Sequence, residues 1–136
     1  MSLSFSPAPD SFTGALAACN HAIERDPQDD DAWLARGQLH ESWLDYERAI
    51  QDYTRALAIN PDRLNVRLDR AFCYAATVEF ELAVADYNKA IELDPERAHS
   101  WFLRGAVNEA AGSTDLRVSE QQSVIGLDQL GFSFSA

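Results

Sequence analysis

The chain has 136 residues, of which 46% are hydrophobic and 24% charged, a composition typical of one folded domain. Its formal net charge is -11, and a field of that sign repels nucleic-acid phosphates and anionic membrane surfaces. The N-terminus lacks the basic and apolar regions of a signal peptide, and no apolar run approaches the ~20 residues of a membrane span. These features predict a cytoplasmic protein that associates with neutral or basic partners.

A repeat of 34 residues organises the chain. Three similar segments, AIERDP, ALAINP and AIELDP, end at prolines that lie 34 residues apart: Pro27, Pro61 and Pro95. A small residue recurs at the same interval inside each unit: Gly37, Ala71 and Gly105. Agreement at this many positions predicts a solenoid of equivalent units rather than one irregular domain.

Each unit carries two helical patterns separated by a turn. In the first unit, apolar and small residues recur at steps of three and four along residues 33–44 and again along residues 46–57. This is the spacing of one face of a helix. Pro61 and Pro95 cannot continue the helix before them, so each marks a corner between units. The pattern therefore predicts an all-α architecture of antiparallel helix pairs.

This pattern resembles the tetratricopeptide repeat over nearly the whole chain, from Asp10 to about Leu130. The signature of aromatic, small and proline residues is present in two successive units: Trp33, Gly37, His40, Ala49, Tyr53, Ala56 and Pro61, then Ala71, Tyr74, Ala83, Tyr87, Ala90 and Pro95. The resemblance implies a right-handed α-α superhelix with three helix pairs and one N-terminal half repeat. It also implies that the chain binds another protein or a peptide.

The repeat boundaries divide the chain into segments. They are an arm at 1–9, a half repeat at 10–29 that holds only a second helix, units at 30–63, 64–97 and 98–130, and a tail at 131–136. Asp10 or Ser11 is expected to cap the helix of the half repeat. The third unit has Arg117 and Gln121 where small and aromatic residues are expected, which is typical of a degenerate, solvent-facing capping helix.

The half repeat leaves an apolar helix face without its usual partner helix. Three occupants of that face are open: the N-terminal arm through Leu3 and Phe5, a second copy of the chain in a homodimer, or a different protein. Burial of two such side chains contributes roughly 1.5–3 kcal/mol each, so an arm of this length could cover the face.

The resemblance places the first helix of each pair on a concave groove. The residues expected to line this groove are Asp31, Leu34, Gln38, Asn65, Leu68, Asp69, Phe72, His99, Phe102, Leu103 and Ala106. Phe72 and Phe102 are the best candidate anchors for a peptide or helix, because aromatic residues dominate interface energy. The alternatives are that these side chains only pack between helices, or that a terminal segment such as LGFSFSA occupies the groove.

One branch of the resembled family clamps the acidic C-terminal tail of chaperones with basic and amide side chains. The matching positions here hold no lysine or arginine: Leu34, Gln38, Asp69, His99 and Leu103. Asp31 and Asp69 would repel such a tail. The groove is therefore predicted to prefer an apolar ligand that is neutral or basic.

Charged residues also recur at the repeat interval. Three arginines and three acids are expected to form structural ion pairs inside their own units: Arg36–Asp52, Arg70–Asp86 and Arg104–Glu120. Pairing between neighbouring units is not expected, because Arg36 would face Ala18. Burial of charge offsets much of the attraction, so these pairs specify register more than stability.

No arrangement of residues indicates catalysis. His21, His40 and His99 belong to different helices, without a second His or Cys at ligand spacing, so neither a metal nor another cofactor is expected. No phosphate-binding loop or nucleophile motif is present. The sequence predicts a protein–protein interaction module and not an enzyme. The alternative is a structural or self-assembling subunit that makes its contacts through the orphan helix and the end caps.

Overall fold

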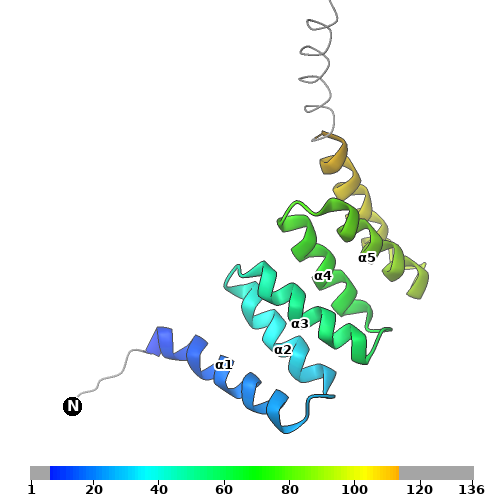
Figure 1. Ribbon diagram of the computed structural model, residues 1–136. Helices are drawn as coiled ribbons and strands as arrows, with labels where there is room; N and C mark the ends of the chain where they lie inside the picture. Colours follow the sequence, from blue (N-terminus) through cyan, green and yellow to red (C-terminus); the bar gives the residue numbers. More distant parts are fainter. Residues whose placement is uncertain (1–6, 114–136) are drawn as a thin grey trace, which may run out of the picture.

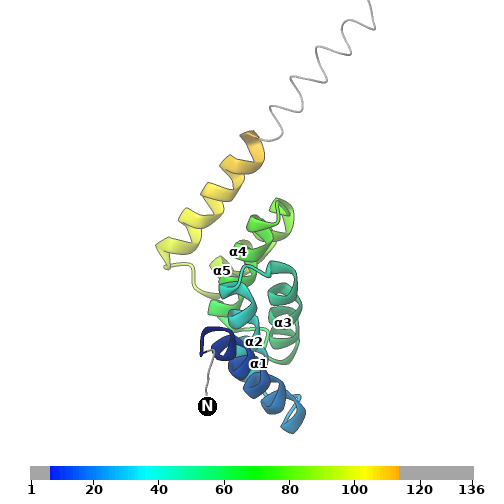
Figure 2. The ribbon, with the colours of Figure 1, turned by 90° about the vertical axis from the view of Figure 1, so that its left-hand side faces the viewer.

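The computed structural model describes residues 7–113. Five helices are α1 (Pro7–Arg25), α2 (Asp30–Ser42), α3 (Tyr46–Ile59), α4 (Leu64–Ala76) and α5 (Phe80–Leu93), and a further helix occupies residues 98–113. They stack in chain order, with α1 at one end and the helix at 98–113, coloured yellow to orange, at the other (Figures 1 and 2). The predicted all-α solenoid is confirmed.

The orphan helix α1 starts earlier than the sequence suggested. It begins at Pro7, ahead of the expected caps Asp10 and Ser11. Proline is tolerated in the first turn of a helix, where its missing N–H has no intrahelical partner in any case. Residues 7–9 of the predicted arm therefore belong to α1. Residues 1–6 of the arm, the predicted second helix of the third unit with Glu120, and the tail lie outside the described residues.

The helix starts in the first pair are capped by aspartates. The Asp29 carboxylate accepts a hydrogen bond from the Asp31 backbone N–H, and Asp45 accepts one from that of Arg48. The helices of the second pair follow Arg63 and Glu79, which make no side-chain capping bond. Aspartate offers an acceptor at the right reach, whereas arginine offers none.

The corners between units repeat a contact that the sequence did not reveal. Trp33 and Trp101 each donate a side-chain hydrogen bond of 2.9 Å to the carbonyl of the proline six residues earlier. At the equivalent position of the second unit, Arg67 donates to the carbonyl of Pro61 at 3.3 Å. Each bond ties the first turn of a helix to the corner that precedes it.

The core is continuous from one unit to the next. Its first cluster is formed by Leu34, Ala49, Tyr53, Ala56, Leu57, Val66 and Cys73. Val66 and Cys73 belong to α4, so the second unit contributes to the core of the first. A second cluster joins α4, α5 and the helix at 98–113 through Ala71, Ala83, Tyr87 and Val107. Burial of each Val or Ile side chain contributes roughly 1.5–3 kcal/mol.

Close approach of the first helix pair depends on Gly37. A Cβ at this position would lie 2.6 Å from Cε1 of Tyr53, whose side chain is fully buried. The glycine therefore faces the tyrosine ring. At the equivalent place in the second pair, Ala71 is fully buried beside Tyr87.

Candidate peptide-binding groove

A pocket of about 420 Å³ opens where α4 meets the start of the helix at 98–113. It brings together predicted groove residues from two units: Asn65, Leu68, Asp69, Phe72, His99 and Leu103. Glu41, Tyr87 and Arg97 complete its lining. A smaller pocket of about 240 Å³ is lined by Gln38, Glu41, Ser42 and Asp69. The two pockets share Glu41 and Asp69, and together they form the groove.

The apolar side of the groove has two kinds of residue. Leu68 and Leu103 are half-buried and pack against the second core cluster, so they support the fold as well as lining the pocket. Phe72 lines the pocket and leaves 48% of its surface exposed, whereas Phe102 lines neither groove pocket and is 70% exposed. Phe72 is steadied by an edge-to-face contact with Tyr46, with ring centroids 6.1 Å apart. Their exposure means that Phe72 and Phe102 are not core residues.

Two carboxylates stand at the centre of the groove. Glu41 accepts a hydrogen bond of 2.7 Å from the Tyr53 hydroxyl and a longer one from the Cys73 thiol. Burial, together with the negative charge of Glu41, raises the pKa of Asp69, although a hydrogen bond from Gln38 opposes the shift. Among residues 11–113, neither carboxylate takes part in an ion pair.

Burial and the same two carboxylates also act on their neighbours. The pKa of the Tyr53 hydroxyl is raised chiefly by burial and then by its hydrogen bond to Glu41. The pKa of the Cys73 thiol is raised by burial and by the charge of Glu41. Both groups are therefore neutral donors that hold Glu41 in place, and the site retains uncompensated negative charge.

Other predicted groove residues lie elsewhere or have a different role. Leu34 was expected in the groove, but it is buried in the first core cluster beside Val66, which is a correction to the sequence prediction. Asp31 lines neither groove pocket, and its exposed carboxylate accepts a hydrogen bond from Arg63 at 2.8 Å. Ala106 is exposed on the helix at 98–113.

Sequence reasoning missed Glu41 and Arg97. Glu41 lies three residues after Gln38, so helical spacing could have placed both on one face of α2. Arg97 lies in the corner before the last described helix, where there is no helical periodicity from which to predict the direction of a side chain. It adds one cation to a pocket lining that also includes Glu41 and Asp69.

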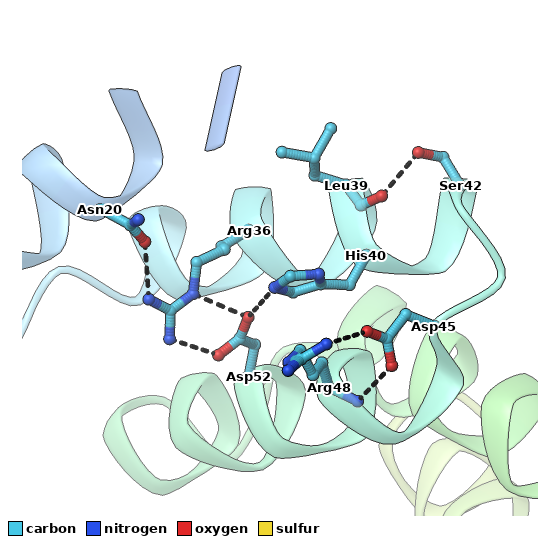
Figure 3. A network of polar contacts seen from close by, with 8 residues as sticks. All are labelled: Asn20, Arg36, Leu39, His40, Ser42, Asp45, Arg48 and Asp52. Atoms are coloured by element: carbon cyan, nitrogen blue, oxygen red, sulfur yellow. Dashed lines mark hydrogen bonds and ion pairs between the residues drawn. The ribbon is translucent and has the colours of Figure 1, made fainter. Parts of the chain in front are cut away.

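The expected arginine pairs are present in the first two units. Arg36 donates two hydrogen bonds to Asp52, at 2.9 and 2.8 Å (Figure 3), and Arg70 makes the same pair of bonds to Asp86 at 2.8 and 2.7 Å. The bond to the carboxylate raises the pKa of each guanidinium. Glu120, the expected partner of Arg104, lies outside the described residues.

Each arginine also reaches the unit before it. The acceptors are the side-chain oxygens of Asn20 for Arg36, Thr54 for Arg70 and Asn88 for Arg104, at 2.9, 3.1 and 2.8 Å. The sequence prediction of pairing only within units was therefore incomplete. A small polar residue 16 positions before each arginine was the available signal.

The first arginine pair borders a second cavity, of about 680 Å³, between α1, α2 and α3. Phe12 and Trp43 line it and contact each other, with ring centroids 4.8 Å apart. His40 is buried, with Nε2 3.8 Å from Asp52 Oδ2 (Figure 3). Within residues 7–113, no three His, Cys, Asp or Glu side chains gather as metal ligands.

The family follows from the repeat, its helix pairs and the groove. A sequence model of the tetratricopeptide repeat matches residues 39–108, more than half of the chain, and a second such model matches residues 18–51. The chain belongs to the tetratricopeptide repeat family. Members of this family are protein–protein interaction modules, and that class of function applies here. No helix among the described residues combines the length and apolar character needed to span a membrane.

Known proteins share this fold at low sequence identity. Over 62 residues the chain is 32% identical to the human peptidyl-prolyl cis-trans isomerase FKBP4, a match that covers 46% of this chain and 14% of that protein. The first tetratricopeptide domain of Spaghetti (RPAP3), bound to an HSP90 peptide, superposes with a TM-score of 0.71 at 18% identity, over 76% of this chain and 82% of that one.

A further similar structure is the Yersinia enterocolitica secretion chaperone SycD in complex with a peptide of the translocator YopD. Its TM-score is 0.63 at 17% identity, and the match covers 80% of this chain and 83% of that one. At these identities the structures establish the fold of this tetratricopeptide repeat protein. Its ligand has to be inferred from the residues of its own groove.

Proposed function

We propose that this chain binds an apolar, neutral or basic peptide or helix of another protein in its groove. The observation that supports this most directly is the 420 Å³ pocket, in which exposed apolar surface lies beside Glu41 and Asp69. Phe72 would anchor an apolar side chain of the ligand, and the carboxylates would receive a neighbouring basic or amide group. A preformed groove on stacked helices limits the ordering of the protein that binding requires.

An acidic chaperone tail is a poor match for this groove. Its carboxylates would face Glu41 and Asp69, and like charges brought together in a partly buried site oppose binding. Among residues 7–113, Arg97 is the one arginine or lysine that lines the pocket. Spaghetti (RPAP3) binds the HSP90 peptide SRMEEVD. For this chain we expect no saturable binding of SRMEEVD at millimolar concentration.

The partner can be captured with matched surface variants. Affinity capture from a source lysate would compare the wild type, a Phe72→Ser/Phe102→Ser groove variant and a Trp101→Ser control. Trp101 is 46% exposed and Phe72 48%, and Trp101 lines neither groove pocket. Both phenylalanines are exposed enough to replace without opening the core. Substitution of the half-buried Leu68 would confound folding with binding.

The proposal expects a protein that the wild type and the Trp101 variant retain and the groove variant loses. A peptide from that protein should then bind the wild type with a 1:1 stoichiometry, and Asp69→Asn should weaken binding if the peptide is basic. Equal capture by all three proteins, or saturable binding of SRMEEVD, would contradict the proposal. Capture of the chain itself alone would favour the alternative, a self-assembling subunit.

A further inference from the structure

Four large apolar side chains are exposed in or next to the α2–α3 and α4–α5 turns. Trp43 and Leu44 follow α2 and are 58% and 71% exposed, and Val78 and Leu82, at and just after the α4–α5 turn, are 62% and 47% exposed. Both turns point to the same side of the stack (Figure 1). We call these four residues the turn edge. None of them lines the groove pockets, so the turn edge is a separate surface.

The backbone of the turn edge is strained at equivalent places. Leu44 and Val78 lie 34 residues apart and have φ angles of 63° and 64°. A Cβ clashes with the backbone in this left-handed region, and a β-branched residue such as valine is especially unfavourable there. Glycine takes this conformation without the clash, and the third unit has Gly112 at the same repeat position.

Folding alone does not account for Leu44 and Val78. Their side chains are mostly exposed, so they contribute little to the core, while their backbone conformation opposes folding. Exposed apolar surface and local strain in two equivalent turns are features expected of residues retained for a contact with another molecule.

The second turn also has a hollow that an apolar side chain can enter. A cavity of about 370 Å³ is lined by Val78, Glu79, Phe80, Glu81, Leu82 and Ala111. It joins the α4–α5 turn to the helix at 98–113, so a ligand lying along the turn edge would have a receptive site at that end.

The surroundings of the turn edge are acidic. Asp45 and Glu47 follow Leu44, and Glu79 and Glu81 follow Val78. The basic residue nearest to them in sequence, Arg48, is already paired with Asp45 at 2.8 Å. A ligand that covers the apolar side chains would therefore place its own flanks against negative charge.

We propose that the turn edge binds an amphipathic helix of a partner protein, with its apolar face on Leu44 and Val78 and basic residues on its flanks. The acidic surroundings oppose the other occupants. A second copy of the chain would bring the same acidic residues against themselves, and an anionic lipid surface would be repelled.

The test uses designed helical peptides and keeps the groove out of the measurement. One peptide has leucines on one face and lysines on both flanks, and the other has glutamate in place of every lysine. Fluorescence anisotropy would measure binding to the 136-residue chain carrying Phe72→Ser/Phe102→Ser, with and without Leu44→Gly/Val78→Gly. The glycine substitutions remove the apolar side chains and relieve the strain, and the melting temperature of each variant separates loss of binding from unfolding.

The expected result is that the lysine peptide binds and that the glycine substitutions weaken it about tenfold or more. The glutamate peptide should bind neither protein. The melting temperature should stay unchanged or rise by a few degrees with the glycines, because strain is removed.

Four outcomes would overturn the proposal. These are unchanged affinity after the glycine substitutions, equal binding of the glutamate peptide, a melting temperature lowered by many degrees, and a dimer in sedimentation velocity that the substitutions dissociate. The third would make Leu44 and Val78 structural, and the fourth would assign the turn edge to self-association. If the wild type co-sedimented with phosphatidylserine vesicles and the glycine variant did not, the turn edge would be assigned to a lipid surface in place of a protein partner.

Discussion

The first and second helix pairs place their tyrosines and acids at the same repeat positions but surround them differently. Tyr53 and Tyr87 are both almost completely buried, and Asp52 and Asp86 are each 3% exposed. Gly37 admits Tyr53 in the first pair, whereas Ala71 accommodates Tyr87 in the second. The fold therefore places a small residue beside the ring in both pairs.

The buried acids differ in the charges that face them. Asp52 accepts hydrogen bonds from Arg36 and has His40 nearby, whereas Asp86 accepts from Arg70 at 2.8 and 2.7 Å and from Arg67 at 3.5 Å. One carboxylate in the second pair thus serves two guanidinium groups. The acid occupies the same repeat position in both pairs, but the stability of the two pairs should depend on it to different degrees. Substitution of each acid can measure that difference in stability.

The largest effect should come from removing the acid of the second pair. Asp86→Asn leaves the partly buried Arg70 and Arg67 without this countercharge, and Arg67 Nε already has no hydrogen-bond partner among the described residues. Breaking a buried ion pair from one side destabilises by about 3–5 kcal/mol. Urea unfolding should show a loss in this range, with a smaller loss for Asp52→Asn. Equal losses would remove the distinction between the pairs.

The next effect tests the closeness of the first pair. Gly37→Ala introduces a Cβ against the buried Tyr53 ring and should destabilise by about 1–3 kcal/mol. The reverse exchange in the second pair, Ala71→Gly, should destabilise by about 1 kcal/mol through helix propensity. Thermal unfolding measures both. If Tyr53→Leu removed the penalty of Gly37→Ala in a double-mutant cycle, the ring would be identified as its cause.

Exchange of the helix caps should give a smaller effect of opposite sign in the two pairs. Asp45→Ala removes a capping bond to the Arg48 N–H and an ion pair with the same residue, and should destabilise by about 1 kcal/mol. Glu79→Asp supplies the shorter acceptor at the equivalent position and should stabilise by about 0.5–1 kcal/mol. A loss of stability in Glu79→Asp would show that this backbone is not arranged to be capped.

The smallest expected effect is a pH dependence of stability that arises in the groove, where Glu41 of the first pair lies near Asp69 of the second. The raised pKa of Asp69 means that folding disfavours its charged form, so lowering the pH from neutral toward its ordinary value of 3.8 relieves that penalty. Relative to Asp69→Asn, the wild type should gain stability over this interval. Parallel pH profiles of the two proteins would contradict the assignment.

The sequence by itself determined the repeat, the helix pairs and the small and aromatic residues that pack them. Prolines and small residues at fixed intervals restrict the backbone locally and can be recognised without knowledge of the neighbouring helices. The arginine–aspartate pairs were also available from the sequence, because equal spacing in antiparallel helices brings equivalent residues to one level. The groove was predicted in part: Asn65, Phe72 and His99 do line it.

The tertiary structure alone decided which side chains face solvent and how the units are joined. Leu34 and Phe72 are both apolar residues on first helices, yet Leu34 is buried between units and Phe72 is exposed. The helix rotation that separates them is set by packing against the next unit, which no single helix encodes. The links from each arginine to the preceding unit, the acidic pair of Glu41 and Asp69, and the strained turns at Leu44 and Val78 depend on the same long-range packing.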